Sequence, residues 1–289
     1  MSYLLYPGCA LEASSSHYGK SAKATMAALG SGLRELDQWS CCGATAYVGT
    51  DEDKAVAYSA RNLALAQSEG ATDLVTACNG CYVMLRKANA CWNASPTLQA
   101  RVSKALGSAG LKYDGSVRVR HLAEVMLNDI GVEAISARVK ASLSGLKVAA
   151  YHGCQISRPF DDVENAERPT VLNKLLAATE AEVVPFPMTA KCCGGMLMTT
   201  RRDVALGLVK SILACARAKG ADCVAVACPL CCVNLECYQE SIRSELGWDK
   251  PMPVVPFTQL LGIALDVPPE ELGLDQCMVD VEPVLARYL

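Results

Sequence analysis

The hydrophobic positions of the chain fall into short apolar runs separated by longer stretches with helical periodicity. Four runs of five or six mostly apolar residues occupy positions 2–6, 73–77, 146–151 and 223–227. Short continuous runs of this kind are typical of strands that are buried on both faces. We therefore predict four buried β-strands.

Two of the intervening stretches have the spacing of amphipathic helices. Each ends near a glycine, Gly70 or Gly220, which suits the C-terminal cap of a helix. Strands that alternate with helices predict an α/β fold with a largely parallel sheet, in which sites gather beyond the carboxyl ends of the strands. The apolar positions concerned are Val56, Ala60 and Leu63 in the first stretch, and Val204, Leu208 and Ile212 in the second.

The sequence also contains an internal repeat. We predict two pseudo-symmetric domains, residues 1–138 and 139–289, each a mainly parallel sheet flanked by helices, with the boundary in the polar stretch 131–145. The matched segments are 6–9 with 151–154, 41–43 with 192–194, and 70–81 with 220–231.

Ten of the sixteen cysteines lie on this repeat, five in each copy. Thiolate is a soft ligand that selects iron–sulfur clusters, zinc or copper(I). The side chains of adjacent cysteines usually diverge, so a pair can serve one centre only where the backbone bends tightly, and Gly43, Gly194 and Gly195 allow such a bend. The first set is Cys9, Cys41, Cys42, Cys78 and Cys81; the second is Cys154, Cys192, Cys193, Cys228 and Cys231.

Length and composition narrow the class of protein. A chain of 289 residues can bury a core without disulfides, and its start lacks the basic residues and long apolar run of a secretory signal. We expect a cytoplasmic protein whose cysteines bind metal or do redox chemistry. A net charge of −3 with no basic tract argues against nucleic-acid binding, and no apolar stretch approaches the ~18 residues of a transmembrane helix.

The cysteines also admit interpretations other than cluster binding. A Cys-x2-Cys pair can be half of a zinc site or a redox pair, but four thiolates satisfy zinc, whereas each repeat offers five. Cys232 aligns with Tyr82 and is either a neighbour of the cluster or a substitute ligand. We expect the remaining thiols to be packed or on the surface: Cys91, Cys215, Cys223, Cys237 and Cys277.

With these residues in place, the pattern resembles the duplicated cysteine-rich CCG domain, and the whole chain resembles the B subunit of heterodisulfide reductase. The match runs from Cys9 to Cys231, and both motifs are complete. The resemblance implies that each domain holds one noncubane [4Fe-4S] cluster through its five cysteines. It also implies that a small-molecule disulfide is cleaved between the two clusters. The archetype of this substrate is the heterodisulfide of coenzyme M and coenzyme B.

The resemblance implies partners as well. They are the C subunit, a ferredoxin-like protein with two [4Fe-4S] clusters, and the A subunit, a flavin-containing protein. The chain has neither a Gly-x-Gly-x-x-Gly fingerprint nor a ferredoxin-type cysteine run, so its electrons must come from elsewhere. We therefore expect a terminal component of a larger complex.

The duplication suits a two-electron reaction. Reduction of a disulfide takes two electrons, whereas an iron–sulfur cluster typically delivers one at a time. We expect the substrate disulfide at the domain interface, where each cluster supplies one electron and binds one departing thiolate. His152 lies two residues before a ligand and is a candidate proton donor, although a structural histidine is the commoner case.

An anionic disulfide would favour cations near the clusters. The second repeat carries basic residues around its cysteines, whereas the first has neutral Ser40 where the second has Lys191. The candidate substrate-binding residues are Arg158, Lys191, Arg201 and Arg202.

Two other functions remain open. CCG domains also occur in electron-transfer subunits of succinate, fumarate, glycolate, lactate and glycerol-3-phosphate oxidoreductases, which pass electrons toward a quinone. Many of those chains carry a fused ferredoxin domain, and this chain does not. The third hypothesis is a zinc-stabilised interaction module without catalysis.

Overall fold

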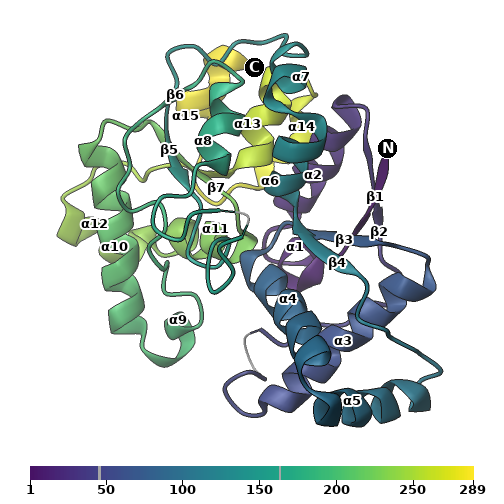
Figure 1. Ribbon diagram of the computed structural model, residues 1–289. Coiled ribbons are helices and arrows are strands. Elements are labelled where there is room, and N and C mark those ends of the chain that lie inside the picture. Colours follow the sequence, from purple (N-terminus) through teal and green to yellow (C-terminus); the bar gives the residue numbers. More distant parts are fainter. Residues whose placement is uncertain (45–46, 163) are drawn as a thin grey trace.

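The computed structural model describes residues 1–44, 47–162 and 164–289 and contains two four-stranded sheets flanked by helices (Figure 1). The strand orders are β2-β1-β3-β4 and β6-β5-β7-β8, and every pairing is parallel. The predicted α/β fold with two repeated sheets is therefore confirmed. The strands are β1 (Ser2–Leu5), β2 (Gly32–Glu35), β3 (Asp73–Thr76), β4 (Arg118–His121), β5 (Lys147–Tyr151), β6 (Glu182–Val183), β7 (Cys223–Val226) and β8 (Val254–Pro256).

The four strands that the apolar runs predicted are the central pair of each sheet, β1 with β3 and β5 with β7. The sequence pattern missed the outer strands. β2 alternates between exposed and partly buried residues, and β6 is only two residues long, so neither carries a continuous apolar run. Edge strands of this kind bury too little surface to be recognised by hydrophobicity alone.

Helices connect the strands and cover the sheets. Those of the first half are α1 (Gly8–Glu12), α2 (Ser16–Ala28), α3 (Glu52–Ser68), α4 (Asn79–Ala94), α5 (Pro96–Ser108), α6 (Leu122–Val125), the π-helix η1 (Met126–Ile130) and α7 (Val132–Ser136). Those that follow are α8 (Val171–Ala177), α9 (Leu197–Thr200), α10 (Arg202–Ala218), α11 (Pro229–Cys237), α12 (Gln239–Leu246), α13 (Phe257–Ala264), α14 (Pro269–Leu272), η2 (Leu274–Gln276), α15 (Glu282–Leu285) and η3 (Ala286–Tyr288).

Both predicted amphipathic helices are present as α3 and α10, and Gly70 and Gly220 follow them with φ of +76° and +75°. The predicted face of α10 was partly wrong. Val204 is 41% exposed, and the buried face begins at Ala205 instead. The reason is local, because the small side chain of Ala205 packs against the backbone of Gly194 in the turn after the paired cysteines.

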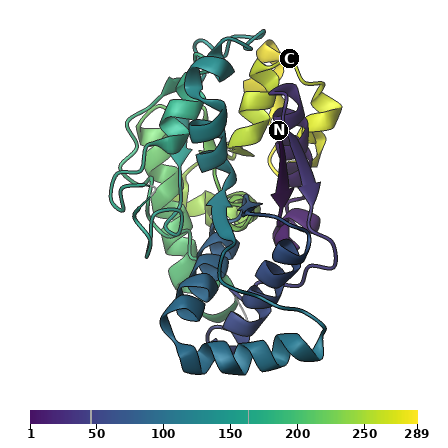
Figure 2. The ribbon, with the colours of Figure 1, turned by 45° about the vertical axis from the view of Figure 1, so that its right-hand side comes forward.

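The two halves are joined by helix α2, which packs against α13 and α14 of the second half (Figure 1). Figure 2 shows the purple N-terminal segment beside the yellow C-terminal helices. Ser21 Oγ lies 2.7 Å from Thr258 Oγ1, and Tyr18 donates a 2.9 Å hydrogen bond to the carbonyl of Ala227 at the end of β7. The contacts orient the two sheets relative to each other, while a division at residues 138 and 139 stays a prediction.

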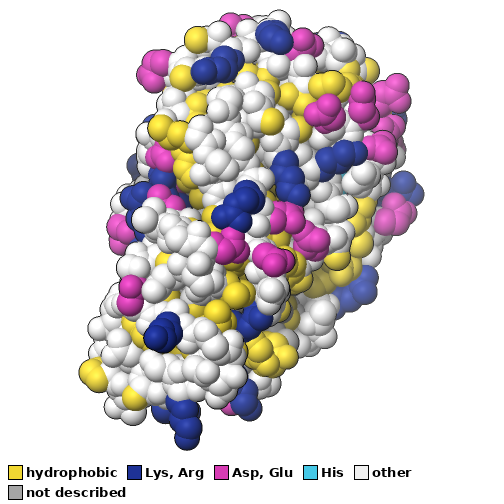
Figure 3. Space-filling view, turned by 90° about the vertical axis from the view of Figure 1, so that its right-hand side faces the viewer, with side chains coloured by type: hydrophobic (Ala, Val, Ile, Leu, Met, Phe, Trp, Pro, Cys, Tyr) yellow, Lys and Arg dark blue, Asp and Glu magenta, His cyan; other side chains and the backbone are white. Residues whose placement is uncertain are grey.

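The surface carries charges of both signs. On the face drawn in Figure 3, Lys and Arg side chains are interspersed with Asp and Glu side chains and with scattered hydrophobic groups. Within the described ranges, no helix combines the length and the hydrophobicity that a membrane span requires.

Candidate metal centre

The candidate site is built on three neighbouring strands in each sheet. β2, β1 and β3 lie side by side in parallel, as do β6, β5 and β7, so their carboxyl ends meet at one edge. Each of these strands leads into a segment with cysteines. β1, β2 and β3 lead to Cys9, Cys41–Cys42 and Cys78–Cys81, and β5, β6 and β7 lead to Cys154, Cys192–Cys193 and Cys228–Cys231.

The two cysteines of each adjacent pair lie in different environments. Cys42 is buried and its sulfur is 3.4 Å from that of Cys81, while Cys41 is partly exposed. In the second half, Cys193 is buried with its sulfur 3.4 Å from that of Cys231. One member of each pair thus joins a Cys-x2-Cys sulfur, while the other member differs between the halves: the thiol of Cys41 also interacts with that of Cys42, whereas the thiol of Cys192 interacts with that of Cys154.

A glycine follows each pair and makes the turn possible. Gly43 and Gly194 have φ of +81° and +90°, a conformation that disfavours any residue with a Cβ. A Cβ at Gly194 would lie 2.8 Å from Cβ of Ala205 on α10. The amides of Gly43 and Gly194 also donate to the sulfurs of Cys41 and Cys192, at 3.4 Å each. The predicted tight bend is thus present in both repeats.

Two buried tyrosines hold the loops that carry the pairs, and the sequence pattern indicated no role for them. Tyr6 donates a 2.8 Å hydrogen bond to the carbonyl of Ser40, and Tyr151 donates a 2.6 Å hydrogen bond to the carbonyl of Lys191. Both acceptors immediately precede the cysteine pair. The one signal in the sequence is that both tyrosines begin the repeated Tyr-x-Gly-Cys motif.

The two sets of cysteines face one cavity. Its volume is about 320 Å³, which falls at the lower end of the ~300 to 1,000 Å³ typical of small-molecule sites. Met196, Leu197 and Leu230 give the wall apolar surface, and Asn79 and Gln155 supply polar groups. All ten cysteines of the repeat line it: Cys9, Cys41, Cys42, Cys78, Cys81, Cys154, Cys192, Cys193, Cys228 and Cys231.

The sets approach each other most closely through the first cysteine of each Cys-x2-Cys. The thiols of Cys78 and Cys228 interact across the cavity, and this hydrogen bond, together with burial, raises the pKa of Cys78. Both residues are the N-caps of their helices, α4 and α11. The positive ends of two helix dipoles therefore point toward the region where the sets meet.

The thiols that line the cavity act strongly on one another. Hydrogen bonding to neighbouring thiols and burial raise the pKa of Cys81 and Cys231, while a hydrogen bond from Cys154 lowers the pKa of Cys192 to about 6. Among the described residues that line the cavity, there is no Lys, Arg or His. Each set has three buried cysteines and two that are partly or fully exposed, and free thiols gathered in this way fit metal–sulfur centres.

His152 lies outside this cavity lining and is fully engaged. Its Nδ1 is 2.6 Å from Oγ1 of Thr189, and its Nε2 accepts a 2.9 Å hydrogen bond from the amide of Leu172. The side chain is completely buried, and burial lowers the pKa of His152 to about 3. These contacts favour a structural role for His152 over proton donation.

The four candidate substrate residues are not among the residues that line the cavity. Arg158 pairs with Glu167, at 2.6 Å, and also reaches the carbonyl of Ala190. Lys191 is exposed immediately before Cys192. Arg201 pairs with Asp203 at 3.2 Å on the surface.

Arg202 stacks over the ring of Tyr238 and donates to Ser241. Of the four residues, Lys191 and Arg158 thus lie beside the loop of the cysteine pair. Arg201 and Arg202 are occupied by neighbours on α10 and around α12.

The other six cysteines are also placed. Cys223 is buried in β7, Cys237 is exposed, and the rest except Cys232 are partly buried: Cys91, Cys215 and Cys277. Cys232 is fully buried but does not line the cavity, since its thiol lies 3.8 Å from the imidazole of His17 and 3.8 Å from the carboxylate of Glu236.

Comparison with known proteins identifies the class. The CCG family, described as a cysteine-rich domain, matches residues 3–86 and again residues 148–236. The chain belongs to this family, and each matched segment contains one set of five cysteines.

Three relatives are similar to this protein over most of the chain. It is 33% identical over 280 residues, 96% of this chain and 97% of the relative, to the 8-methylmenaquinol:fumarate reductase membrane anchor subunit of Wolinella succinogenes. It is 32% identical over 258 residues, 88% of this chain and 85% of the relative, to the B subunit of a ferredoxin/F420H2-dependent CoB-CoM heterodisulfide reductase of Methanosarcina acetivorans. A protein of Archaeoglobus profundus, named for its likeness to the B subunit of heterodisulfide reductase, is 30% identical over 294 residues, 99% of this chain and 98% of the relative.

A solved structure shares the fold. The crystal structure of a hypothetical protein from Helicobacter pylori superposes with a TM-score of 0.77 at 16% identity and covers 97% of this chain. This chain spans 52% of the length of that structure. The resemblance to the B subunit of heterodisulfide reductase is thereby confirmed at the level of the family, and the chain is a heterodisulfide reductase-like CCG subunit with an oxidoreductase role in a complex.

Proposed function

We propose that this chain is the component of a heterodisulfide reductase-like complex that reduces a small-molecule disulfide to two thiols. The observation that supports the proposal is that two sets of five cysteines line one cavity of about 320 Å³. A single cavity between two equivalent sets offers the two sulfur atoms of a disulfide equivalent surroundings. A site for electron transfer alone has no need of a cavity between its centres.

Each set of five cysteines would hold one noncubane [4Fe-4S] cluster. Such clusters, when bound, supply one electron each and a metal site with affinity for sulfur. The residues of the chain position the ligands: Tyr6 and Tyr151 fix the loops of the pairs, and Gly43 and Gly194 form the turns. Burial of three ligands in each set limits the access of water to their sulfur atoms.

The lining of the cavity suits the uncharged centre of a disulfide. Met196, Leu197 and Leu230 would contact apolar groups of the substrate, and the side-chain amides of Asn79 and Gln155 would lie near its polar groups. Anionic ends of a substrate would lie toward the mouth of the cavity, where exposed Lys191 precedes a ligand. Electrons would come from a ferredoxin-like C subunit and, through it, from a flavin-containing A subunit.

The test uses anaerobically purified protein and compares Cys42→Ala and Cys193→Ala with the control Cys91→Ala. Cys91 is a partly buried thiol outside both sets. We expect about eight irons per chain in the wild type and the control, and about four in each ligand variant. With a reduced viologen as donor, each ligand variant loses disulfide reduction. Full activity in either ligand variant would overturn the proposal, because one set would then suffice.

The role of the basic residues is tested by kinetics with an anionic and a neutral disulfide. Lys191→Ala and Arg158→Ala are expected to raise KM for the anionic substrate only. Arg201→Ala is the matched control, because Arg201 pairs with Asp203 on the surface. Equal KM values in Lys191→Ala, Arg158→Ala and the control would remove these residues from substrate binding.

The relative from Wolinella succinogenes favours a second candidate, in which the chain passes electrons between a partner and a quinone. The two candidates differ in the acceptor of the electrons. If the reduced protein is oxidised by a quinone analogue and never by a disulfide, the second candidate replaces the first. Zinc in place of iron and acid-labile sulfide in the purified protein would favour the third candidate, a zinc-stabilised interaction module without catalysis.

A further inference from the structure

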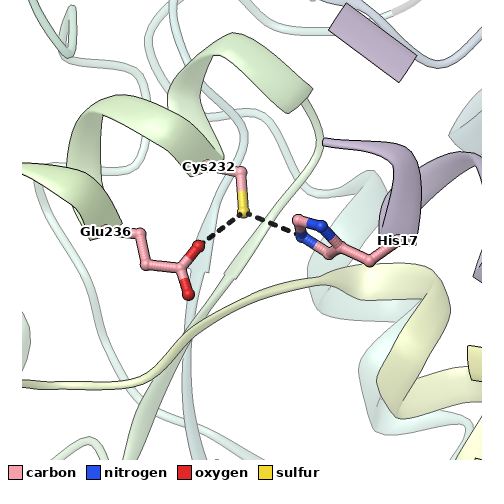
Figure 4. A group of neighbouring side chains, drawn as sticks. All are labelled: His17, Cys232 and Glu236. Carbon is pink, nitrogen blue, oxygen red and sulfur yellow. Dashed lines mark hydrogen bonds between the residues drawn. The ribbon is translucent and has the colours of Figure 1, made fainter. Parts of the chain in front are cut away.

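A second group of metal-ligating side chains lies away from the ten-cysteine cavity. His17 on α2 and Cys232 and Glu236 on α11 are side by side in the interior (Figure 4). Their nitrogen, sulfur and oxygen donor atoms all lie within 4.8 Å of one another. The exposed fractions of the three residues are 3%, 0% and 3%, so the group is closed to solvent.

The geometry of the group follows from the fold. Cys232 and Glu236 are four residues apart on α11 and therefore project from the same face of the helix. Helix α2 of the first half brings His17 against this face, and Figure 4 shows the imidazole and the carboxylate on opposite sides of the thiol. The sulfur of Cys232 is 3.8 Å from Nε2 of His17 and 3.8 Å from Oε2 of Glu236.

The two distances from the sulfur are close to edges of a tetrahedral zinc site. Zn–S bonds of ~2.3 Å and Zn–N or Zn–O bonds of ~2.0 to 2.1 Å at tetrahedral angles place the sulfur about 3.6 Å from a nitrogen or oxygen ligand. The observed contacts of 3.8 Å are also of the length of hydrogen bonds to a thiol. The spacing around the sulfur is therefore compatible with a shared cation.

A cation would stabilise the ionised form of the buried carboxyl group. In the part of the chain that the structure describes, no Lys or Arg forms an ion pair with Glu236. One oxygen, Oε1, accepts a 2.8 Å hydrogen bond from the amide of Val279, and the other faces Cys232. Burial raises the pKa of Glu236 to about 7, and coordination of a metal would offset this cost of ionisation.

We propose that His17, Cys232 and Glu236 bind one Zn²⁺ at a site separate from the iron–sulfur centre. The mixed nitrogen, sulfur and oxygen donor set is one that zinc accepts. The ligands come from both halves of the chain, so the metal fixes α2 against α11. Helix α11 begins next to Cys228 and contains Cys231, and the zinc would thus orient the second set of cluster ligands relative to the first half.

The test measures zinc and iron together in anaerobically purified protein with its full iron content, after dialysis against a weak chelator. We expect about one zinc per chain in addition to the iron. Cys232→Ala and His17→Gln should lose the zinc and keep the iron, while Cys223→Ala, a variant at a buried thiol of β7, should keep both. Zinc that is found only in iron-depleted protein would overturn the proposal, because it would then occupy the cluster ligands.

A second measurement uses wild-type protein and therefore does not depend on whether the variants fold. Wild-type protein grown with cobalt in place of zinc should show the intense visible bands of tetrahedral Co²⁺ and an absorption from sulfur-to-cobalt charge transfer. X-ray absorption at the zinc edge should show one sulfur ligand together with lighter ligands. A site with four sulfur ligands, or wild-type protein without zinc or cobalt, would refute the assignment.

Discussion

Gly8 lies against a proposed cluster ligand, and a single methyl group there tests whether the position of that ligand matters. A Cβ at Gly8 would be 2.8 Å from the sulfur of Cys81, closer than real contacts allow. The residue also has φ of +70°, which costs ~1 to 2 kcal/mol for a residue with a side chain. The variant Gly8→Ala therefore combines backbone strain with displacement of one sulfur.

Gly70→Ala separates these two effects. Gly70 has φ of +76° at the end of α3, but a Cβ there would meet nothing within 4 Å. In both variants, backbone strain alone should cost ~1 to 2 kcal/mol of stability, a fall of roughly 2 to 8 °C in melting temperature for a protein of this size, and the clash in Gly8→Ala adds to this loss. Only Gly8→Ala should move the sulfur of Cys81, by roughly 0.5 Å, which exceeds the ±0.2 Å that metal–ligand distances tolerate.

The assay is the iron content of the two purified variants, with their melting temperatures. We expect Gly70→Ala to keep about eight irons per chain and Gly8→Ala to keep about four, those of the second set. Full iron in Gly8→Ala would refute the reasoning, because the displaced sulfur would then not be a ligand. Equal loss of iron in both variants would show that stability alone, and not the contact, decides occupancy.

Buried polar contacts give three further predictions. Tyr6→Phe and Tyr151→Phe each leave a loop carbonyl without its donor and should cost ~1 to 3 kcal/mol, with loss of iron from the set in the same half, measured by metal analysis and thermal melting. The pKa of His152 is lowered to about 3 in the folded state from an ordinary 6.5. The contribution of neutral His152 to stability is therefore complete above pH 6.5 and falls as the pH drops toward 3. Denaturation at several pH values should show that the free energy of unfolding decreases less over this range in His152→Gln than in the wild type. Arg120 is 4% exposed and donates two hydrogen bonds of 2.6 and 2.8 Å to Asp129. Arg120→Met should therefore lower the free energy of unfolding by about 3 kcal/mol. An unchanged melting temperature would show that the pair is dispensable.

The repeated sequence pattern predicted much of the architecture, because the central strands of both sheets follow from short-range patterns. The central strands are buried on both faces, and their apolar runs are therefore visible in the sequence. The outer strands β2 and β6 were missed because β2 is half exposed and β6 has two residues. Yet it is these strands that lead into the loops of the paired cysteines, so their pairing with β1 and β5 decides where the loops lie.

The cysteine spacing predicted which thiols belong together but not what surrounds them. Tyr6 and Tyr151 act on loop carbonyls more than thirty residues away in sequence, and a motif cannot reveal such a partner. The sequence contains no signal for His17, because its partners are 215 and 219 positions further along the chain. Contacts of this kind depend on the packing of α2 against the second half, which no local pattern encodes.

The central claim is that two metal–sulfur centres share one cavity, and anomalous diffraction at the iron edge from crystals of the fully loaded protein tests it most directly. We predict two separate iron peaks within one chain. One peak would lie among Cys9, Cys41, Cys42, Cys78 and Cys81, the other among Cys154, Cys192, Cys193, Cys228 and Cys231, with the cavity between them. A single iron peak, or two peaks of which one lies away from these sulfur atoms, would contradict it.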